Sequence, residues 1–211
     1  MSRPTEENRD ATGRPDTNEL DAAAVRRTLA GELAAFDELV NRYQKRAVSV
    51  AYRLVGNTHD AMEIAQDAFL RAFRSLRTLK EPGRFGPWLV RIVSNLSLNH
   101  RRSRRLWAHA GGLPEDDMLE GGASVRTAEG ETSAAAGEWS LDEAASSEMA
   151  TKVRQAIDEL PEKQRLALIL FAIEGWPQRD VAEVLECSLE TVKWNVFQAR
   201  KTLKTKLAEY L

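Results

Sequence analysis

The chain lacks most of the features that catalytic, secreted or membrane-spanning proteins require. Its 211 residues include one cysteine, Cys187, which excludes an internal disulfide framework and fits a reducing compartment. Three scattered histidines (His59, His100 and His109) show no metal-ligand spacing with that cysteine. No apolar run approaches the roughly 20 residues of a membrane span, and the polar N-terminus has no signal-peptide core. We therefore expect a cytoplasmic protein with no membrane insertion, no metal site and no cofactor.

Motifs of enzyme active sites are also missing. The sequence contains no Gly-rich phosphate loop, no nucleophile elbow and no carboxylate pair in a catalytic setting. What it does contain is 43% hydrophobic and 29% charged residues, a composition typical of a globular protein. We interpret the chain as a binding protein and not as an enzyme.

The net charge of −2 conceals a strong segregation of charge along the chain. Residues 21–106 carry sixteen basic and eight acidic side chains, whereas residues 107–147 carry one basic and nine acidic side chains. The segregation, and not the net charge, therefore carries the information about binding partners.

Hydrophobic spacing predicts helices and no strands. Apolar side chains recur at helical intervals from residue 33 to 54, and Gly56 stands where that helix would end. Thr58 can cap a second helix, and a third begins near Pro87 and continues into a run of arginines. A segment rich in Gly, Ala, Ser and acidic residues follows, without periodicity. We predict an all-α fold of two small helical domains, with a disordered tail at 1–18, the first domain at 19–106, a flexible acidic linker at 107–147 and the second domain at 148–211.

The end of the second domain has the order of a helix-turn-helix, with a short helix at 178–185, a turn, and a long basic helix at 189–207. Ser188 can cap the long helix because its hydroxyl accepts a hydrogen bond from a free backbone N–H. Such a pair of helices commonly places side chains in a DNA major groove. The alternative is a surface hairpin with a solvated lysine face. The long helix would bury Leu189, Val192, Val196, Ala199 and Leu203.

The third helix carries a mixed aromatic, amide and arginine surface that suits single-stranded or melted nucleic acid. Planar groups stack on bases, amides bond to base edges and guanidinium groups hold phosphates. For Trp88 alone a core position is the simpler interpretation, but four arginines within residues 101–105 exceed what a helix end needs. The surface comprises one helix side and its basic extension: Trp88, Ile92, Asn95, Asn99, Arg91, Arg101 and Arg102.

The second helix offers an acidic patch on an otherwise basic domain. Asp60, Glu63, Gln66 and Asp67 would repel phosphate and could dock on a protein, although for these residues alone ordinary solvated charge is the preferred interpretation. The opposite side of the helix would be buried through Ala61, Ile64, Ala65, Ala68, Phe69, Ala72, Phe73 and Leu76.

Together these segments resemble the sigma-70 family, and the two-domain layout is similar to its extracytoplasmic-function (ECF) subgroup. Residues 60–73 resemble the family's polymerase-binding helix, and residues 85–99, FGPWLVRIVSNLSLN, resemble its promoter-melting and −10-reading segment. Residues 160–165 and 188–203 look like the start and the recognition helix of its −35-reading domain. The resemblance covers most of residues 30–106 and 148–207, with three motifs in the right order.

The resemblance implies an alternative sigma factor that binds core RNA polymerase, recognises two promoter elements and aids melting of the promoter DNA. Factors of this subgroup are often held by an anti-sigma factor, which the sequence does not identify. Polymerase binding would fall on Asp60, Glu63, Gln66 and Asp67. Contact with the −10 element would fall on Arg91, Asn95, Asn99, Arg101 and Arg102. Contact with the −35 element would fall on Ser188, Thr191, Lys193, Trp194, Asn195, Gln198 and Arg200.

The recognition helix departs from the family pattern. Trp194 replaces a serine, and Asn195 and Gln198 replace two arginines. Asn and Gln pair best with adenine and release no counterions, so we predict a non-standard −35 sequence, a weaker dependence on that element, or both. Two other functions remain open from the sequence. The chain could be a stand-alone helix-turn-helix regulator that binds duplex DNA without polymerase, or a decoy that titrates another regulator.

Overall fold

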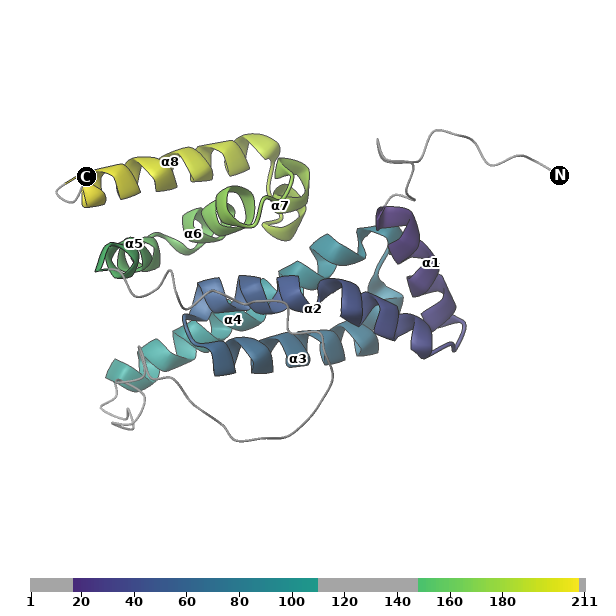
Figure 1. Ribbon diagram of the computed structural model, residues 1–211. Coiled ribbons are helices and arrows are strands. Elements are labelled where there is room, and N and C mark those ends of the chain that lie inside the picture. The colour runs from purple at the N-terminus through teal and green to yellow at the C-terminus, as the bar shows by residue number, and fades with distance from the viewer. Residues whose placement is uncertain (1–16, 110–147, 209–211) are drawn as a thin grey trace.

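The computed structural model describes residues 17–109 and 148–208, and every regular element within these two ranges is a helix (Figure 1). The predicted all-α, two-domain fold is confirmed. The predicted boundaries need two corrections: residues 17 and 18, assigned to the tail, begin helix α1, and residues 107–109, assigned to the linker, continue helix α4. The rest of the predicted tail and linker lies outside the described residues.

The first domain consists of four helices, in which α2, α3 and α4 pack on one another and α1 packs across them. Helix α3 buries mostly alanines, whose small side chains allow close helix packing. Its predicted buried side is confirmed except for Phe73, which is exposed at the domain edge and packs against the ring of Phe36. The bounds are α1, Thr17–Leu29; α2, Ala34–Val55; α3, Thr58–Ser75; and α4, Phe85–His109.

Local residues determine where these helices begin and end. Gly56 ends α2 with a left-handed φ of 78°, a conformation that costs glycine little. Asn57 caps α3, since its side chain accepts a hydrogen bond from the backbone N–H of Asp60 at 3.0 Å. The cap is therefore Asn57 and not Thr58, the first helical residue. At the start of α4, a Cβ on Gly86 would lie 2.7 Å from the Tyr43 hydroxyl, so glycine permits the close approach of α4 to α2.

A buried carboxylate attaches α1 to α2. Asp21 is almost fully buried, where it pairs with Arg42 and accepts a hydrogen bond from the Tyr43 hydroxyl. Burial, followed by the bond to Asp21, raises the pKa of Tyr43, so the phenol stays protonated and remains a donor. Two short 3₁₀ turns, η1 (Leu76–Thr78) and η2 (Pro82–Arg84), lead from α3 to α4.

The second domain contains four further helices and one π-helical turn. Helix α6 runs directly into the π-helical turn η5, and Gly175 follows with a φ of 69°. The helix-turn-helix is confirmed, and α8 has the bounds that the sequence predicts. The elements are α5, Glu148–Asp158; α6, Glu162–Leu168; η5, Ile169–Ile173; α7, Gln178–Val184; and α8, Leu189–Leu207.

The turn before α8 forms as its residues suggest. The Ser188 hydroxyl accepts a hydrogen bond from the backbone N–H of Thr191 at 3.2 Å and so caps α8. Val192, Val196 and Ala199 are buried as predicted, whereas Leu189 is 41% exposed. Leu189 lies in the first turn of α8, in which Val192 is fully buried.

The two domains share one continuous core. Leu166, Leu170, Trp176 and Val181 of the second domain belong to the same buried cluster as the apolar residues of the first domain, and α7 packs on α4. Figure 1 shows the group α5–α8, in green to yellow, lying along α2 and α4, with α8 as its outer layer. Among the helices of the described residues, none combines the length and the apolar character that crossing a membrane would take.

Candidate protein and nucleic-acid interfaces

The acidic patch predicted on α3 forms on the outer side of that helix. Glu63, Gln66 and Asp67 are exposed there and share the surface with Met62 and Leu70, two exposed apolar side chains. The patch is therefore acidic with apolar neighbours, a combination that suits contact with a protein better than contact with phosphate.

The fourth predicted member of the patch, Asp60, is oriented differently. It is only partly exposed, and its carboxylate lies 3.1 Å from Arg104 Nη1 and 3.1 Å from His100 Nε2, both on α4. Asp60 therefore links α3 to the basic end of α4 as well as bordering the patch.

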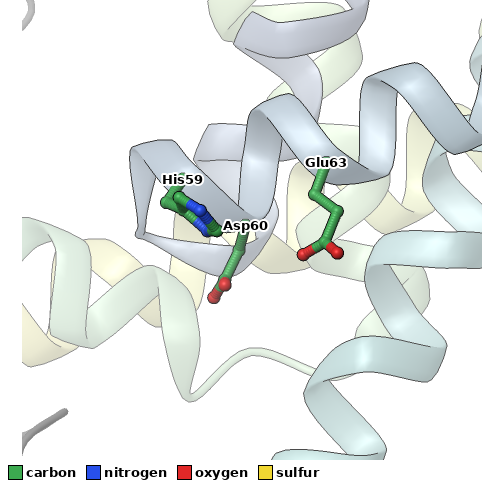
Figure 2. A group of neighbouring side chains, drawn as sticks. All are labelled: His59, Asp60 and Glu63. Carbon is green, nitrogen blue, oxygen red and sulfur yellow. The ribbon is translucent and has the colours of Figure 1, made fainter.

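His59, Asp60 and Glu63 form the grouping drawn in Figure 2, in which the ligand atoms of the three side chains lie within 4.8 Å of one another. Such a grouping has the donor types of a metal site. However, His59 and Glu63 are exposed, and the Arg104 guanidinium already neutralises the Asp60 carboxylate. A cation at this point would be repelled by Arg104, so we assign these residues to the charged surface of the domain.

The predicted nucleic-acid surface of α4 divides into two kinds of residue. Asn95 and Asn99 are exposed, with their amides on the surface. Trp88 and Ile92 are half-buried and pack against the shared core, and the Trp88 ring lies 6.0 Å from the ring of Phe85. Trp88 therefore serves mainly as a core residue, in line with the simpler interpretation of its position in the sequence.

The three predicted arginines of α4 each pair with a carboxylate of the second domain. Arg91 Nη2 lies 2.5 Å from Glu186. Arg102 donates to both carboxylate oxygens of Glu162, at 3.1 and 2.6 Å, and this contact lowers the pKa of Glu162. Arg101 donates to Asp158 at 2.6 Å, and also at 2.6 Å to the Leu54 carbonyl near the end of α2.

Arg165, which ends the 160–165 motif, has a structural position. It is 2% exposed and donates to three carbonyls at the end of α5, those of Ile157, Asp158 and Leu160. Burial, followed by repulsion from Arg101, lowers the pKa of Arg165 to about 10, so it stays protonated at neutral pH. Its three hydrogen bonds gather the last carbonyls of α5 and that of Leu160, and so fix the end of α5 beside Arg101.

The predicted DNA-contacting residues of α8 do not all reach the surface. Lys193, Trp194 and Arg200 are exposed, and Ser188 is exposed although its hydroxyl is used as the cap. Thr191 and Gln198 are partly exposed.

Asn195 is placed differently from the expectation. It is 4% exposed, and its amide donates to the Thr191 carbonyl at 2.8 Å, so the side chain faces the protein.

One exposed residue of the same surface, Phe197, is not among the sequence predictions. It is 63% exposed and follows Trp194 by three positions, so the two aromatic side chains lie on the same side of α8, next to the side that carries Lys193 and Arg200. The helical spacing from Trp194 is the signal that could have identified it. The exposed face of α8 thus combines aromatic and basic side chains.

Two family descriptions match the chain, and they correspond to its two domains. Sigma-70 region 2 matches residues 39–106, and Sigma-70, region 4 matches residues 150–203. Among solved structures, CnrH in complex with the cytosolic domain of CnrY is similar with a TM-score of 0.62 and 22% identity, over 90% of this chain and 98% of that one. The sigma factor RpoE in complex with the anti-sigma factor NepR from Bartonella quintana has a TM-score of 0.56 and 21% identity, over 82% and 96%.

Curated relatives are similar over most of their length. The RNA polymerase sigma-H factor of Pseudomonas aeruginosa is 32% identical over 197 residues, which cover 92% of this chain and 97% of that protein. The ECF sigma factor SigW of Bacillus subtilis is 29% identical, with coverage of 88% and 95%. The ECF sigma-E factor of Escherichia coli K12 is 30% identical, with coverage of 89% and 94%. With both sigma regions present in order on its two helical domains, the chain belongs to the sigma-70 family of RNA polymerase sigma factors, in the ECF subgroup.

Proposed function

We propose that this protein is an alternative sigma factor that binds core RNA polymerase in the cytoplasm and directs initiation at specific promoters. It would recognise a −35 and a −10 element and aid melting of the duplex, with no bond chemistry of its own. The observation that carries this function is the presence of both sigma regions on two helical domains, each with a binding surface of suitable chemistry.

The outer side of α3 is the proposed polymerase surface. Glu63, Gln66 and Asp67 supply charge and hydrogen-bonding groups there, and Met62 and Leu70 supply apolar contact area. Because this surface lies on a basic domain yet is itself acidic, it would reject DNA and accept a protein partner. Asp60 would contribute at the edge, where Arg104 holds its carboxylate in place.

The exposed part of α4 is the proposed −10 surface. The Asn95 and Asn99 amides can bond to the edges of unpaired bases. Arg91, Arg101 and Arg102 would hold phosphates of the same strand, once they are free of their carboxylate partners.

The outer side of α8 is the proposed −35 surface. Lys193 and Arg200 would contact phosphates or guanine edges, Trp194 would pack against groove atoms, and Gln198 would pair with adenine. Ser188 and Thr191 lie at the first turn of α8, where the positive end of the helix dipole would attract a phosphate. For Asn195, the buried position supports a role in holding the helix and not in reading bases.

An anti-sigma factor is a proposed additional partner. The similar structures of CnrH and of the Bartonella quintana RpoE each contain a second protein, and NepR is described there as an anti-sigma factor. If this chain is controlled in the same way, a complex of the chain with such a protein should not bind polymerase. Unchanged polymerase binding in its presence would contradict the proposal.

Reconstituted transcription tests the function directly. The purified protein is added to core polymerase with a library of random promoter sequences, and the transcripts are sequenced. A sigma factor produces transcripts from templates with a common −35 and −10 sequence. Duplex binding without polymerase would support the stand-alone regulator. The absence of both activities would support the decoy.

A charge-reversal variant tests the α3 surface in the same assay. Glu63→Arg with Asp67→Arg should weaken polymerase binding by more than tenfold, because it introduces like charges at a protein interface. The matched control is Asp37→Arg with Glu81→Arg, which changes the net charge equally at exposed positions outside α3. Equal loss of binding in both variants would contradict the assignment.

A further inference from the structure

The exposed aromatic residues of α8 lie on the side of the helix that faces away from its own domain. Residues three and four positions apart share one side of a helix, and one ridge of α8 follows this spacing through Glu190, Trp194, Phe197 and Lys201. At about 3.6 residues per turn, this ridge is opposite to the buried side formed by Val192, Val196 and Ala199. A recognition helix enters DNA with the side that its domain leaves uncovered, so the two rings stand where the groove would be reached most deeply.

Two aromatic rings on this ridge are an unusual use of the surface. Trp194 is 56% exposed and Phe197 is 63% exposed. A single exposed apolar side chain is ordinary, but two neighbouring rings form an apolar patch, and such patches mark binding sites. The hydrophobic core uses the opposite side of α8, through Val192 and Val196, and so does not account for either ring.

The charge around the rings indicates the class of partner. Lys193, Arg200 and Lys204 are exposed along one flank of the ridge, and Lys201 lies on the ridge itself. A row of cations suits the regularly spaced phosphates of nucleic acid, and the major groove of a duplex is wide enough to admit a helix. In such a complex the cations would face the DNA backbone, and the rings would face the edges of the bases.

Only one base offers these rings an apolar group in the major groove. The edges of adenine, guanine and cytosine show hydrogen-bonding atoms there, whereas thymine also carries a 5-methyl group. The Phe197 ring has no hydrogen-bond donor or acceptor, and Trp194 has one donor on a large apolar ring. The rings therefore gain most from the thymine methyl group, because both apolar surfaces leave water together.

A neighbouring amide fits the base that pairs with thymine. Gln198 follows Trp194 by four positions and so lies beside it on α8. Amide side chains bond to N6 and N7 of adenine, and the methyl group of the paired thymine is displayed in the same groove. A ring and an amide side by side can therefore read the two halves of one A·T pair.

We propose that Trp194 and Phe197 select thymine in the −35 element by packing their rings on its 5-methyl group. The proposal rests on the proposed function, because it takes α8 to be the −35-reading helix, and it names the base that is read. It also explains the departure from the family pattern at position 194. A serine there would offer a hydroxyl group and little apolar area, so the tryptophan changes what the position recognises.

Removal of a single methyl group from the DNA tests the proposal. The full-length protein is combined with core polymerase, and its −35 element is selected from random promoter sequences. Each thymidine of this element, on either strand, is then replaced in turn by deoxyuridine, which lacks only the 5-methyl group. Promoter binding should weaken about fourfold at one or two positions, since a methyl group contributes about as much as one buried CH₂ group. Equal binding to thymine and uracil at every position, or an element without an A·T pair, would overturn the proposal.

A variant without the rings assigns the discrimination to these two residues. Trp194→Ser with Phe197→Ser should bind the thymine and uracil templates equally. The matched control, Leu33→Ser with Met149→Ser, removes two exposed apolar side chains outside α8 and should keep the discrimination. Undiminished discrimination in the variant without rings would overturn the proposal. The comparison of thymine with uracil in the original protein does not depend on the folding of any variant.

The same measurements distinguish failure of this proposal from failure of the proposed function. If initiation is promoter-specific but no position distinguishes thymine from uracil, the proposed function stands and the reading of thymine is overturned. If the variant without rings loses affinity for core polymerase in the absence of DNA, the rings form a protein contact, which also overturns the proposal. Absence of specific initiation by the original protein would overturn both.

Discussion

The helices α4 and α8 carry the two proposed nucleic-acid surfaces of this sigma factor, and they differ in how exposed the basic groups of those surfaces are. On α8, Lys193 and Arg200 are exposed beside Trp194 and Phe197, and the surface lies on the outer side of its domain. On α4, the asparagines are exposed, but the arginines are paired with carboxylates from the other domain. The basic groups of α8 are thus accessible to DNA, whereas those of α4 are paired within the protein.

The difference follows from how charge is distributed within the second domain. Of the ten basic and ten acidic residues at 148–211, α8 carries five basic and one acidic, whereas residues 148–186 carry five basic and eight acidic. One domain can therefore present a basic side to DNA and an acidic side to α4. The net charge of residues 148–211 is therefore zero, although the domain has one basic and one acidic surface. Each surface can bind a different partner because the two lie apart in space.

The largest expected effect is on the amides of α4. Replacement of Asn95 and Asn99 by Ala should reduce polymerase-dependent initiation by about 100-fold, since each amide that reads a base contributes roughly 1–3 kcal/mol. Base unstacking in the −10 region, followed with a fluorescent adenine analogue, should fall in parallel, whereas −35 binding should persist. Ser103→Ala, at an exposed position on the same helix, is the control. Initiation at the original rate in the double variant would show that α4 does not read bases.

A smaller effect is expected when α8 is made more like its family. Trp194→Ser with Gln198→Arg introduces the serine and one of the two arginines found in the family pattern. Selection from random duplex DNA should shift toward a guanine-containing −35 sequence, with a preference of about tenfold over the original motif, because arginine binds guanine edges. Unchanged initiation at templates that depend on the −10 element would show that α8 and α4 read their elements independently. Selection of the usual G-rich motif by the original protein would contradict the prediction of a non-standard element.

The smallest effect is expected at Asn195. Asn195→Ala removes one buried hydrogen bond to the Thr191 carbonyl and should lower the free energy of unfolding by about 1 kcal/mol, measured from urea denaturation. The selected −35 sequence should stay the same, because the side chain faces the protein. Gln198→Ala, at a partly exposed position one turn later, should instead change the selected sequence with little loss of stability. A changed motif in Asn195→Ala would place its side chain at the DNA.

Much of the fold could be predicted from local patterns. The bounds of α8 and the buried side of α3 follow from helical spacing, and the Ser188 cap follows from residue type. The same patterns misplaced Leu189 and Asn195, because spacing identifies the sides of a helix but not how far its neighbours extend over it. Position 195 lies beside Val192 on the covered side, where an amide is tolerated because it donates a hydrogen bond to the Thr191 carbonyl.

The sequence by itself determined the helices, their order and the family, and it indicated the three proposed binding surfaces, because these depend on spacing, caps and motifs along the chain. Only the tertiary structure decided that Arg91, Arg101 and Arg102 lie against Glu186, Asp158 and Glu162. The partners in these pairs are separated by more than fifty residues, and each arginine could pair with any nearby carboxylate. The packing of α7 on α4 selects among them, since ion pairing depends on distances that no local pattern specifies.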